Sequence, residues 1–197
     1  NTVLSTSNGW RAHGMAVSDD SDGNILSNND VTSAGLSSDG FQYALYLGGT
    51  GQHIDNQTRV DHRVGPAESR QEYRGILAGK ARGVWNGKAI VHEGADGTDA
   101  EQSNHNLLLS QSAEINAKPE LEIYADDVKC SHGTTVGQLD DAQLFYLRSR
   151  GIPANQAHSM LCQGFAAEVV DSCTNSDFRE ALSDLLDRRL QGLAEAG

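Results

Sequence analysis

The chain has 197 residues, with 15 Lys and Arg against 27 Asp and Glu, which gives a formal net charge of −12. This length fits one domain, or a domain with a small appendage. The acidic balance argues against nucleic-acid binding, because that function needs clustered Lys and Arg. The longest apolar stretches, such as Leu107-Leu108-Leu109, fall far short of the roughly 20 residues that cross a bilayer. We therefore expect neither a nucleic-acid partner nor a membrane.

The cysteine content points to a reducing compartment. Cys130, Cys162 and Cys173 form neither an even disulfide framework nor a CxxC metal-binding pair. A cytoplasmic location fits this pattern best. The chain begins at Asn1, without an initiator Met and without a basic-then-apolar signal stretch. We interpret it as a piece of a longer protein.

The first half of the chain is typical of short strands. Residues 1–40 are rich in Ser, Asp, Asn and Gly and predict short strands joined by loops, or partial disorder. The segment 41–47 places Phe41, Tyr43, Leu45 and Leu47 at alternate positions, on one face of a strand. Farther on, Asn86-Gly87 lies between two runs of strand formers and predicts a tight hairpin turn.

Two more strands are predicted before Gly137. In the segment 121–126, apolar and polar residues alternate, and the next segment places Val128, Cys130 and His132 on one face. Because many short strands are punctuated by glycine, the sequence predicts an all-β body, as a sandwich, a barrel or a solenoid. A search for a repeat of 20–25 residues finds no clean one, so periodicity does not choose among the three.

After Gly137 the pattern becomes helical. Asp140 or Asp141 can cap a helix that runs to Arg150, and Gly151 is placed to end it. A second helix is expected after Pro153, and a third near Ser176 or Asp177. The predicted apolar stripes are Ala157, Met160, Leu161, Phe165 and Val169 in the second helix, and Phe178, Ala181, Leu182, Leu185 and Leu186 in the third. We expect a β body over 1–138 and a helical domain over 139–197.

Cys130-Ser131-His132 is the most informative chemical motif. Residues two apart project from the same face of a strand, so Cys130 and His132 lie a few ångströms apart. A thiolate and an imidazole so placed can bind Zn or Fe, or act as a nucleophile and its base. Two ligands do not complete a metal site, and no further ligand lies nearby in the sequence. The alternative is a buried cysteine beside a hydrogen-bonded histidine.

Other candidate residues are weaker. Glu122 and Asp126 alternate onto one predicted strand face and form a possible acid–base pair for a sugar substrate. In an acidic chain, however, most carboxylates form a solvated face. The scattered histidines are interpreted as turn or surface residues, namely His53, His62, His92 and His105. No phosphate-binding loop and no GxSxG nucleophile motif is present.

Three segments resemble the SufB/SufD family of iron–sulfur cluster assembly proteins. They are Lys118 to Gly133 (KPELEIYADDVKCSHG), Thr98 to Ser110 (TDAEQSNHNLLLS), and Leu144 to Ile152 (LFYLRSRGI). The Lys-Cys-Ser-His-Gly form is similar to the SufD branch of the family. The resemblance runs from about residue 42 to the end of the chain and does not clearly cover 1–40.

The resemblance implies a right-handed parallel β-helix followed by a helical C-terminal domain. SufD-like proteins pair with SufB through their β-helices, and each binds a SufC ATPase through its C-terminal helices, here about 155–190. By this resemblance His132 is a ligand to iron or to a transient Fe–S cluster at the SufB interface. Cys130 lies beside it, and SufB supplies the complementary thiolate. The family also has an N-terminal helical region that this chain does not contain.

The leading hypothesis is therefore a SufD-like scaffold subunit without catalytic turnover, in a cytoplasmic SufB–SufC–SufD complex. No cofactor is expected to bind tightly to this chain alone. One alternative is a homodimeric scaffold that works without SufB. The other is a β-helix enzyme that acts on polysaccharide through Glu122 and Asp126.

Overall fold

The computed structural model describes residues 2–8, 11–17, 25–33, 39–49, 52–172 and 176–195. Side chains are described from residue 44 onward within these ranges, except for Phe178 and 192–195. The strands are β1 (Thr2–Asn8), β2 (Arg11–Val17), β3 (Ile25–Ser33), β4 (Asp39–Gly48), β5 (His53–His62), β6 (Glu68–Leu77), β7 (Arg82–Val91), β8 (Asp99–Leu108), β9 (Glu114–Ile123) and β10 (Lys129–Gly137). They are followed by the helices α1 (Asp141–Ser149), α2 (Ala154–Asp171) and α3 (Ser176–Glu195).

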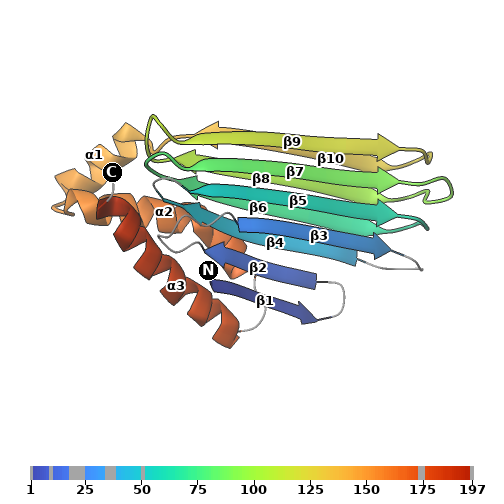
Figure 1. Cartoon of the computed structure of the whole chain (residues 1–197), viewed down its shortest axis with the longest axis horizontal. Helices are drawn as coiled ribbons and strands as arrows, with labels where there is room; N and C mark the ends of the chain where they lie inside the picture. Colours follow the sequence, from blue (N-terminus) through green and yellow to red (C-terminus); the bar gives the residue numbers. More distant parts are fainter. Residues whose placement is uncertain are drawn as a thin grey trace.

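The strands form a parallel β-solenoid. One sheet has the order β1-β2-β4-β6-β8-β10 and the other has the order β3-β5-β7-β9, so from β3 onward successive strands alternate between the two sheets (Figure 1). Pairing is parallel throughout, except that β1 and β2 are antiparallel. Of the three all-β folds that the sequence leaves open, the chain adopts the solenoid, as the family resemblance implies.

The spacing between coils explains why the repeat search fails. Paired strands place Asp39 opposite Glu68 and Arg82 opposite Glu114, so register partners lie 29 to 32 residues apart in the chain. This period is longer than the 20–25 residues searched, and it varies from coil to coil. The strands from β4 to β9 all have ten residues, so the variation falls in the turns.

The predicted hairpin at Asn86-Gly87 is wrong, because β7 runs unbroken from Arg82 to Val91. Both residues have partners on both sides; Gly87 lies opposite Thr58 of β5 and Pro119 of β9. A Cβ on Gly87 would lie 2.3 Å from the ring of Trp85, a side chain that is fully buried. The glycine therefore makes room for the tryptophan in the solenoid interior, and it does not form a turn.

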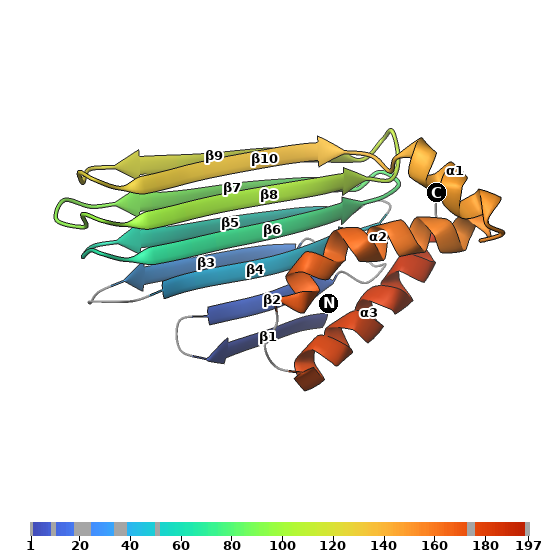
Figure 2. The same cartoon turned by 180° about the vertical axis from the view of Figure 1, so that it is seen from behind.

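The helices cover part of one sheet. Leu45 and Leu47 of β4 point outward from the solenoid and pack with Ile76 and Leu107 against buried residues of α2 and α3. Figure 2 shows α2 at the ends of β4 and β6, which run toward it, and α3 beside α2. The predicted alternation of Leu45 and Leu47 is thus confirmed as one buried face; the side chains of Phe41 and Tyr43 lie outside the described residues. Tyr46, between the two leucines, is buried on the opposite, interior face.

The three predicted helices are present with their expected ends. The Asp140 side chain accepts a hydrogen bond of 2.8 Å from the backbone N–H of Ala142, and Gly151 ends α1 with φ of 87°. The predicted stripe of α2 is partly wrong, because Met160 is exposed and the buried face is centred on Cys162 and Ala166. Its buried residues are Ala157, Cys162, Ala166, Val169 and Val170. In α3 they include Leu182, Leu185, Leu186 and Leu190, whereas Ala181 is exposed and Phe178 is not described.

The solenoid interior is unusually polar for a core. Tyr73 and Trp85 pack across it with ring centroids 5.6 Å apart, which joins the two sheets. Around them, amide and hydroxyl side chains are buried. These are Asn56, Thr58, Ser69, Gln71, Gln102, Asn104 and Asn106. Buried polar groups need hydrogen-bond partners. Some of these come from the facing sheet, as Thr58 does for Gln71, and others from the adjacent coil, as Gln71 does for Gln102.

Candidate functional site

The last coil ends the solenoid with two strand edges. β10 is the terminal strand of the six-stranded sheet and β9 is the terminal strand of the four-stranded sheet. Among the described residues no strand pairs with their outer edges. Both edges therefore present backbone N–H and C=O groups side by side (Figure 2). Large apolar side chains are exposed on the same coil, with 43% of Ile123, 60% of Tyr124 and 52% of Val136 accessible to solvent.

Cys130 and His132 lie on β10 at this open end. Cys130 is the register partner of Ala100 and His132 is the register partner of Gln102, both on β8. Ala100 and Gln102 are buried in the interior, so the two β10 residues are on the strand face that continues the interior by one coil. The sequence prediction that Cys130 and His132 share a strand face is in keeping with this register. Cys130 is half-buried and His132 is exposed.

Cys130 is a free thiol. Burial raises the pKa of the Cys130 thiol, and the nearby Asp99 carboxylate raises it further, against a lowering by a backbone hydrogen bond with Ala100. Cys130 is therefore mainly protonated at neutral pH. A thiol is a poor metal ligand until it loses its proton, so binding to a cation must release a proton from this side chain.

The interior below His132 holds a hydrogen-bonded series of side chains. Gln102 Nε2 donates to Gln71 Oε1 over 2.6 Å, and Gln71 Nε2 donates to Thr58 Oγ1 over 3.2 Å. The other amide atom of Gln102, Oε1, is buried and has no hydrogen-bond partner among the described residues. His132 thus lies one coil above an acceptor whose hydrogen-bonding capacity is unused.

The described residues hold no group of three or more His, Cys, Asp or Glu side chains that could bind a metal ion. Cys130 and His132 supply one sulfur and one nitrogen donor, a mixed set that iron accepts. A stable centre needs further ligands. Since the two donors are at an open end, those ligands have space to come from a second chain.

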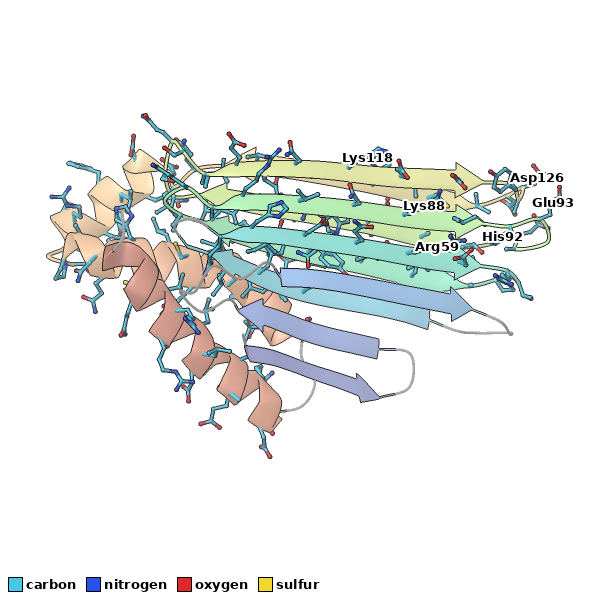
Figure 3. The ribbon with its side chains drawn as sticks, viewed as in Figure 1. Arg59, Lys88, His92, Glu93, Lys118 and Asp126 are labelled. Atoms are coloured by element: carbon cyan, nitrogen blue, oxygen red, sulfur yellow. The ribbon has the colours of Figure 1, made fainter. Side chains whose placement is uncertain are left out.

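The predicted carboxylate pair does not form on one strand. β9 ends at Ile123, and Asp126 lies in the bend that leads to β10, where its backbone N–H donates to the Asp96 carboxylate over 2.9 Å. Glu122 remains on the outer face of β9 and forms an ion pair of 2.7 Å with Lys88 of β7. Figure 3 shows Lys88 along the sheet and Asp126 beyond its end. The expectation that Glu122 and Asp126 share a strand face was wrong, because the strand stops before Asp126.

Three of the four histidines interpreted as turn or surface residues have hydrogen-bond partners, and His53 lies at the start of β5. His62 is buried, contrary to the expected turn or surface position, and its Nε2 hydrogen-bonds to Ser69 Oγ over 2.9 Å. His92 binds the Asp61 carboxylate over 2.8 Å, and His105 hydrogen-bonds to Thr135 over 2.8 Å. The alternating polar residues of β8 were the signal for a polar interior that sequence reasoning missed. These residues lie 31 positions after their register partners on β6, so the stacking of the two sets can be recognised only when the coil length is known.

No helix in the described part of the chain is long and apolar enough to cross a membrane.

Comparison with known proteins identifies the class of protein that this solenoid and its helices form. A family model described as "SUF system FeS cluster assembly, SufBD core domain" matches residues 19–165. The chain belongs to this SufBD family. The match starts earlier than residue 42, where the resemblance noted from the sequence begins.

Particular relatives include proteins named SufD. The chain is 44% identical over 138 residues to iron–sulfur cluster assembly protein SufD of Escherichia coli K12, which covers 70% of this chain and 33% of that protein. It is 31% identical over 170 residues to SufD of Bacillus subtilis 168, which covers 86% of this chain and 39% of that protein. A SufBD family protein of Mycobacterium leprae is 35% identical over 169 residues, or 82% of this chain and 43% of that protein. The chain spans less than half the length of these relatives.

Proposed function

We propose that this chain is part of a SufD-like scaffold subunit for iron–sulfur cluster assembly, without catalytic turnover of its own. The observation that carries the proposal is the position of Cys130 and His132 on the terminal coil, next to two strand edges with which no described strand pairs. The family match and the SufD relatives support it. A cytoplasmic location belongs to the same proposal.

In this proposal His132 is a ligand to iron or to a transient Fe–S cluster, which is cargo and not a resident cofactor. Cys130 is the neighbouring, less exposed donor. A SufB-like partner contributes the complementary thiolate. Sharing the ligands between two chains accounts for the small number of donors on this one, and it lets a finished cluster leave when the chains separate.

The SufB-like partner is proposed to bind through the β-helix at its open end. Strand edges bind other strands by continuing the backbone hydrogen bonding of the sheet. The exposed side chains of Ile123, Tyr124 and Val136 offer apolar contacts at that place. The interface would then enclose Cys130 and His132 and exclude water from the cluster.

The helices are proposed to dock a SufC-like ATPase, with 139–197 as a domain separate from the β body of 1–138. α2 and α3 bury one face each on the solenoid or on each other, so their other faces are available within about 155–190. α1 has no buried residue, and 74% of Phe145 and 56% of Tyr146 is exposed. Large exposed apolar side chains on a helix are typical of a partner surface.

Two experiments test the proposal. The first is a pull-down of the chain with SufC, and with SufB–SufC, in the presence and absence of ATP; binding is expected, and no binding to either would contradict the partner assignment. The second compares His132→Ala and wild type for cluster formation in the reconstituted SufB–SufC–SufD complex. We expect loss of cluster formation; an unchanged rate would remove His132 from the ligand set.

A homodimeric scaffold remains the second candidate, because the strand edges of β9 and β10 can also pair with those of an identical chain. Light scattering with size exclusion, with and without SufB, separates the two. A dimer that persists when SufB is added in excess favours the homodimer. A heterocomplex that replaces it favours the SufB-paired scaffold. The polysaccharide-enzyme alternative gains no support from Glu122 and Asp126, which do not share a strand face.

A further inference from the structure

On the interior face of the six-stranded sheet, three side chains at the same register position form a column. Gln71 of β6, Gln102 of β8 and His132 of β10 are successive partners across the sheet. Adjacent strands in a sheet are about 4.8 Å apart, so stacked side chains on the same face are within hydrogen-bonding reach of one another. The first link of the column is made, since Gln102 Nε2 donates to Gln71 Oε1 over 2.6 Å.

In the structure, this hydrogen bonding runs in one direction along the column. Thr58 Oγ1 accepts from Gln71 Nε2, which leaves Gln71 Oε1 as the acceptor for Gln102 Nε2. In this arrangement the amide of Gln102 presents its oxygen to the remaining side. Gln102 is 1% exposed, and its Oε1 has no partner among the described residues. A buried amide oxygen left in this state is costly, so a donor that can reach it will be favoured.

His132 is the donor at the next position of the column. Its side chain is exposed at the coil end, and no hydrogen bond or ion pair holds it to the described residues, so its rotamer is free to change. A neutral imidazole carries one N–H donor and one nitrogen lone pair. We propose that Gln102 is a positioning residue, whose Oε1 accepts the N–H of His132 and thereby directs the other ring nitrogen out of the open end.

This inference rests on the proposed function and deepens it. A histidine that binds a metal commonly donates its other ring N–H to a carbonyl or carboxylate oxygen, and this bond fixes both the tautomer and the ring orientation. Gln102 supplies such an oxygen from the interior of the same chain. The ligand nitrogen of His132 is then oriented before any partner or iron arrives. The residue touches no cargo, so it acts only through His132.

The test measures the tautomer of His132 in the chain itself, without iron. Long-range ¹H–¹⁵N correlation spectra of ¹⁵N-histidine-labelled protein distinguish the two neutral tautomers, and His132→Ala assigns the signals. The spectra are recorded near pH 9 in order to observe the neutral form of the imidazole. We expect one tautomer to dominate in wild type and its excess to fall about fivefold in Gln102→Met, a substitution of similar volume that lacks the acceptor.

Two further variants separate positioning from packing. Gln102→Glu keeps an oxygen acceptor at the same place and is expected to retain the wild-type tautomer. Asn104→Leu removes a buried amide from the next interior position of β8, which pairs with Thr134 and not with His132. It is expected to lower stability without changing the tautomer. Circular dichroism and tryptophan fluorescence verify that each variant is folded.

The outcomes that overturn the inference are specific. Equal tautomer ratios in wild type and Gln102→Met would show that Gln102 does not hold His132. A change in Asn104→Leu as large as that in Gln102→Met would assign the effect to general packing. Neither result depends on iron, so a failure here is distinct from a failure of His132→Ala to stop cluster formation.

Discussion

Arg74 of β6 donates a hydrogen bond of 2.6 Å from Nη1 to the backbone carbonyl oxygen of Phe165 in α2. The same guanidinium pairs with Glu168 of α2 and lies 5.1 Å from the centroid of the Phe165 ring. On its own strand it pairs with Glu72 over 3.0 Å. One side chain therefore joins the helices to the solenoid through charge, hydrogen bonding and ring contact.

The network extends from Arg74 to the strand that carries Cys130 and His132. Glu72 lies 3.9 Å from His105 of β8, and His105 hydrogen-bonds to Thr135 of β10 over 2.8 Å. Polar contacts thus connect α2 to β10 across three adjacent strands. Such a connection is a continuous physical path between the helices and the terminal coil.

Replacing Arg74 by Ala is expected to destabilise the protein strongly. The change leaves Glu72, which is mostly buried, without its cation, and frees the carbonyl of Phe165. We expect the free energy of unfolding to fall by about 2–4 kcal/mol. Urea denaturation measures it, and hydrogen exchange should show faster exchange in α2. Arg82→Ala is the matched control, because Arg82 and Glu114 are exposed and 3.9 Å apart. A loss as large in Arg82→Ala would contradict the argument.

Gly87→Ala tests the interior packing of the solenoid. The added Cβ would lie 2.3 Å from the Trp85 ring, which is enclosed and cannot move freely. We expect a loss of about 1–3 kcal/mol in the free energy of unfolding, with a change in Trp fluorescence. Gly164→Ala in α2 meets no atom within 4 Å. Because alanine is the better helix former, that variant is expected to gain up to about 1 kcal/mol. Equal effects of the two substitutions would be incompatible with this packing.

Asp61 predicts a pH dependence of stability. Hydrogen bonds from Arg59, aided by His92, lower the pKa of the buried Asp61 carboxyl from 3.8 to about 2. Because the pKa is lower in the folded state, the stabilisation is present above pH 4 and is lost as the pH falls toward 2. Asp61→Asn is expected to cost about 2 kcal/mol at pH 7 and much less near pH 2.

Urea denaturation of wild type and Asp61→Asn at several pH values between 7 and 2 measures this difference. Glu93→Gln, on the exposed turn that follows His92, serves as the control and should alter stability little. A difference between wild type and Asp61→Asn that stays constant down to pH 2 would rule out the linkage.

The two described cysteines are expected to react at different rates. Burial and the Asp99 carboxylate raise the pKa of Cys130, so alkylation by iodoacetamide should be slow at pH 7 and rise about tenfold per pH unit toward pH 9. Cys162 is fully buried between the helices and the sheet, and burial raises its pKa to about 11. It should react only on unfolding. Mass spectrometry of alkylated peptides follows both, with Cys130→Ser as the control; faster labelling of Cys162 would refute the assigned burial.

The sequence was sufficient to predict the helices and the motif on β10. Caps such as Asp140 and Gly151 depend on local geometry, which neighbouring residues specify. The face shared by Cys130 and His132 likewise follows from strand alternation. Family resemblance, and not periodicity, predicted the solenoid.

What could not be predicted depends on contacts between coils. Asn86-Gly87 has the local signature of a turn, but the pairing of β7 with β5 and β9 on both sides overrides it. A bend separates Glu122 from Asp126, because β9 ends at Ile123. The alternation of apolar and polar residues continues through 126 and gives no sign that the strand ends earlier. The unused acceptor on Gln102 becomes visible only when Gln71 is known to be its neighbour, 31 residues earlier in the chain.

The constant strand length determines where insertions and deletions can be accommodated in this fold. Since β4 to β9 each have ten residues while the coil period varies, insertions in the turns leave the interior intact. Deletion of one residue within β8, such as Glu101, would instead exchange its two faces, so that Ser103 and His105 enter the interior and Asn104 and Asn106 leave it. The number of residues in a turn can therefore vary, whereas the number of residues in a strand decides which side chains face the solenoid interior.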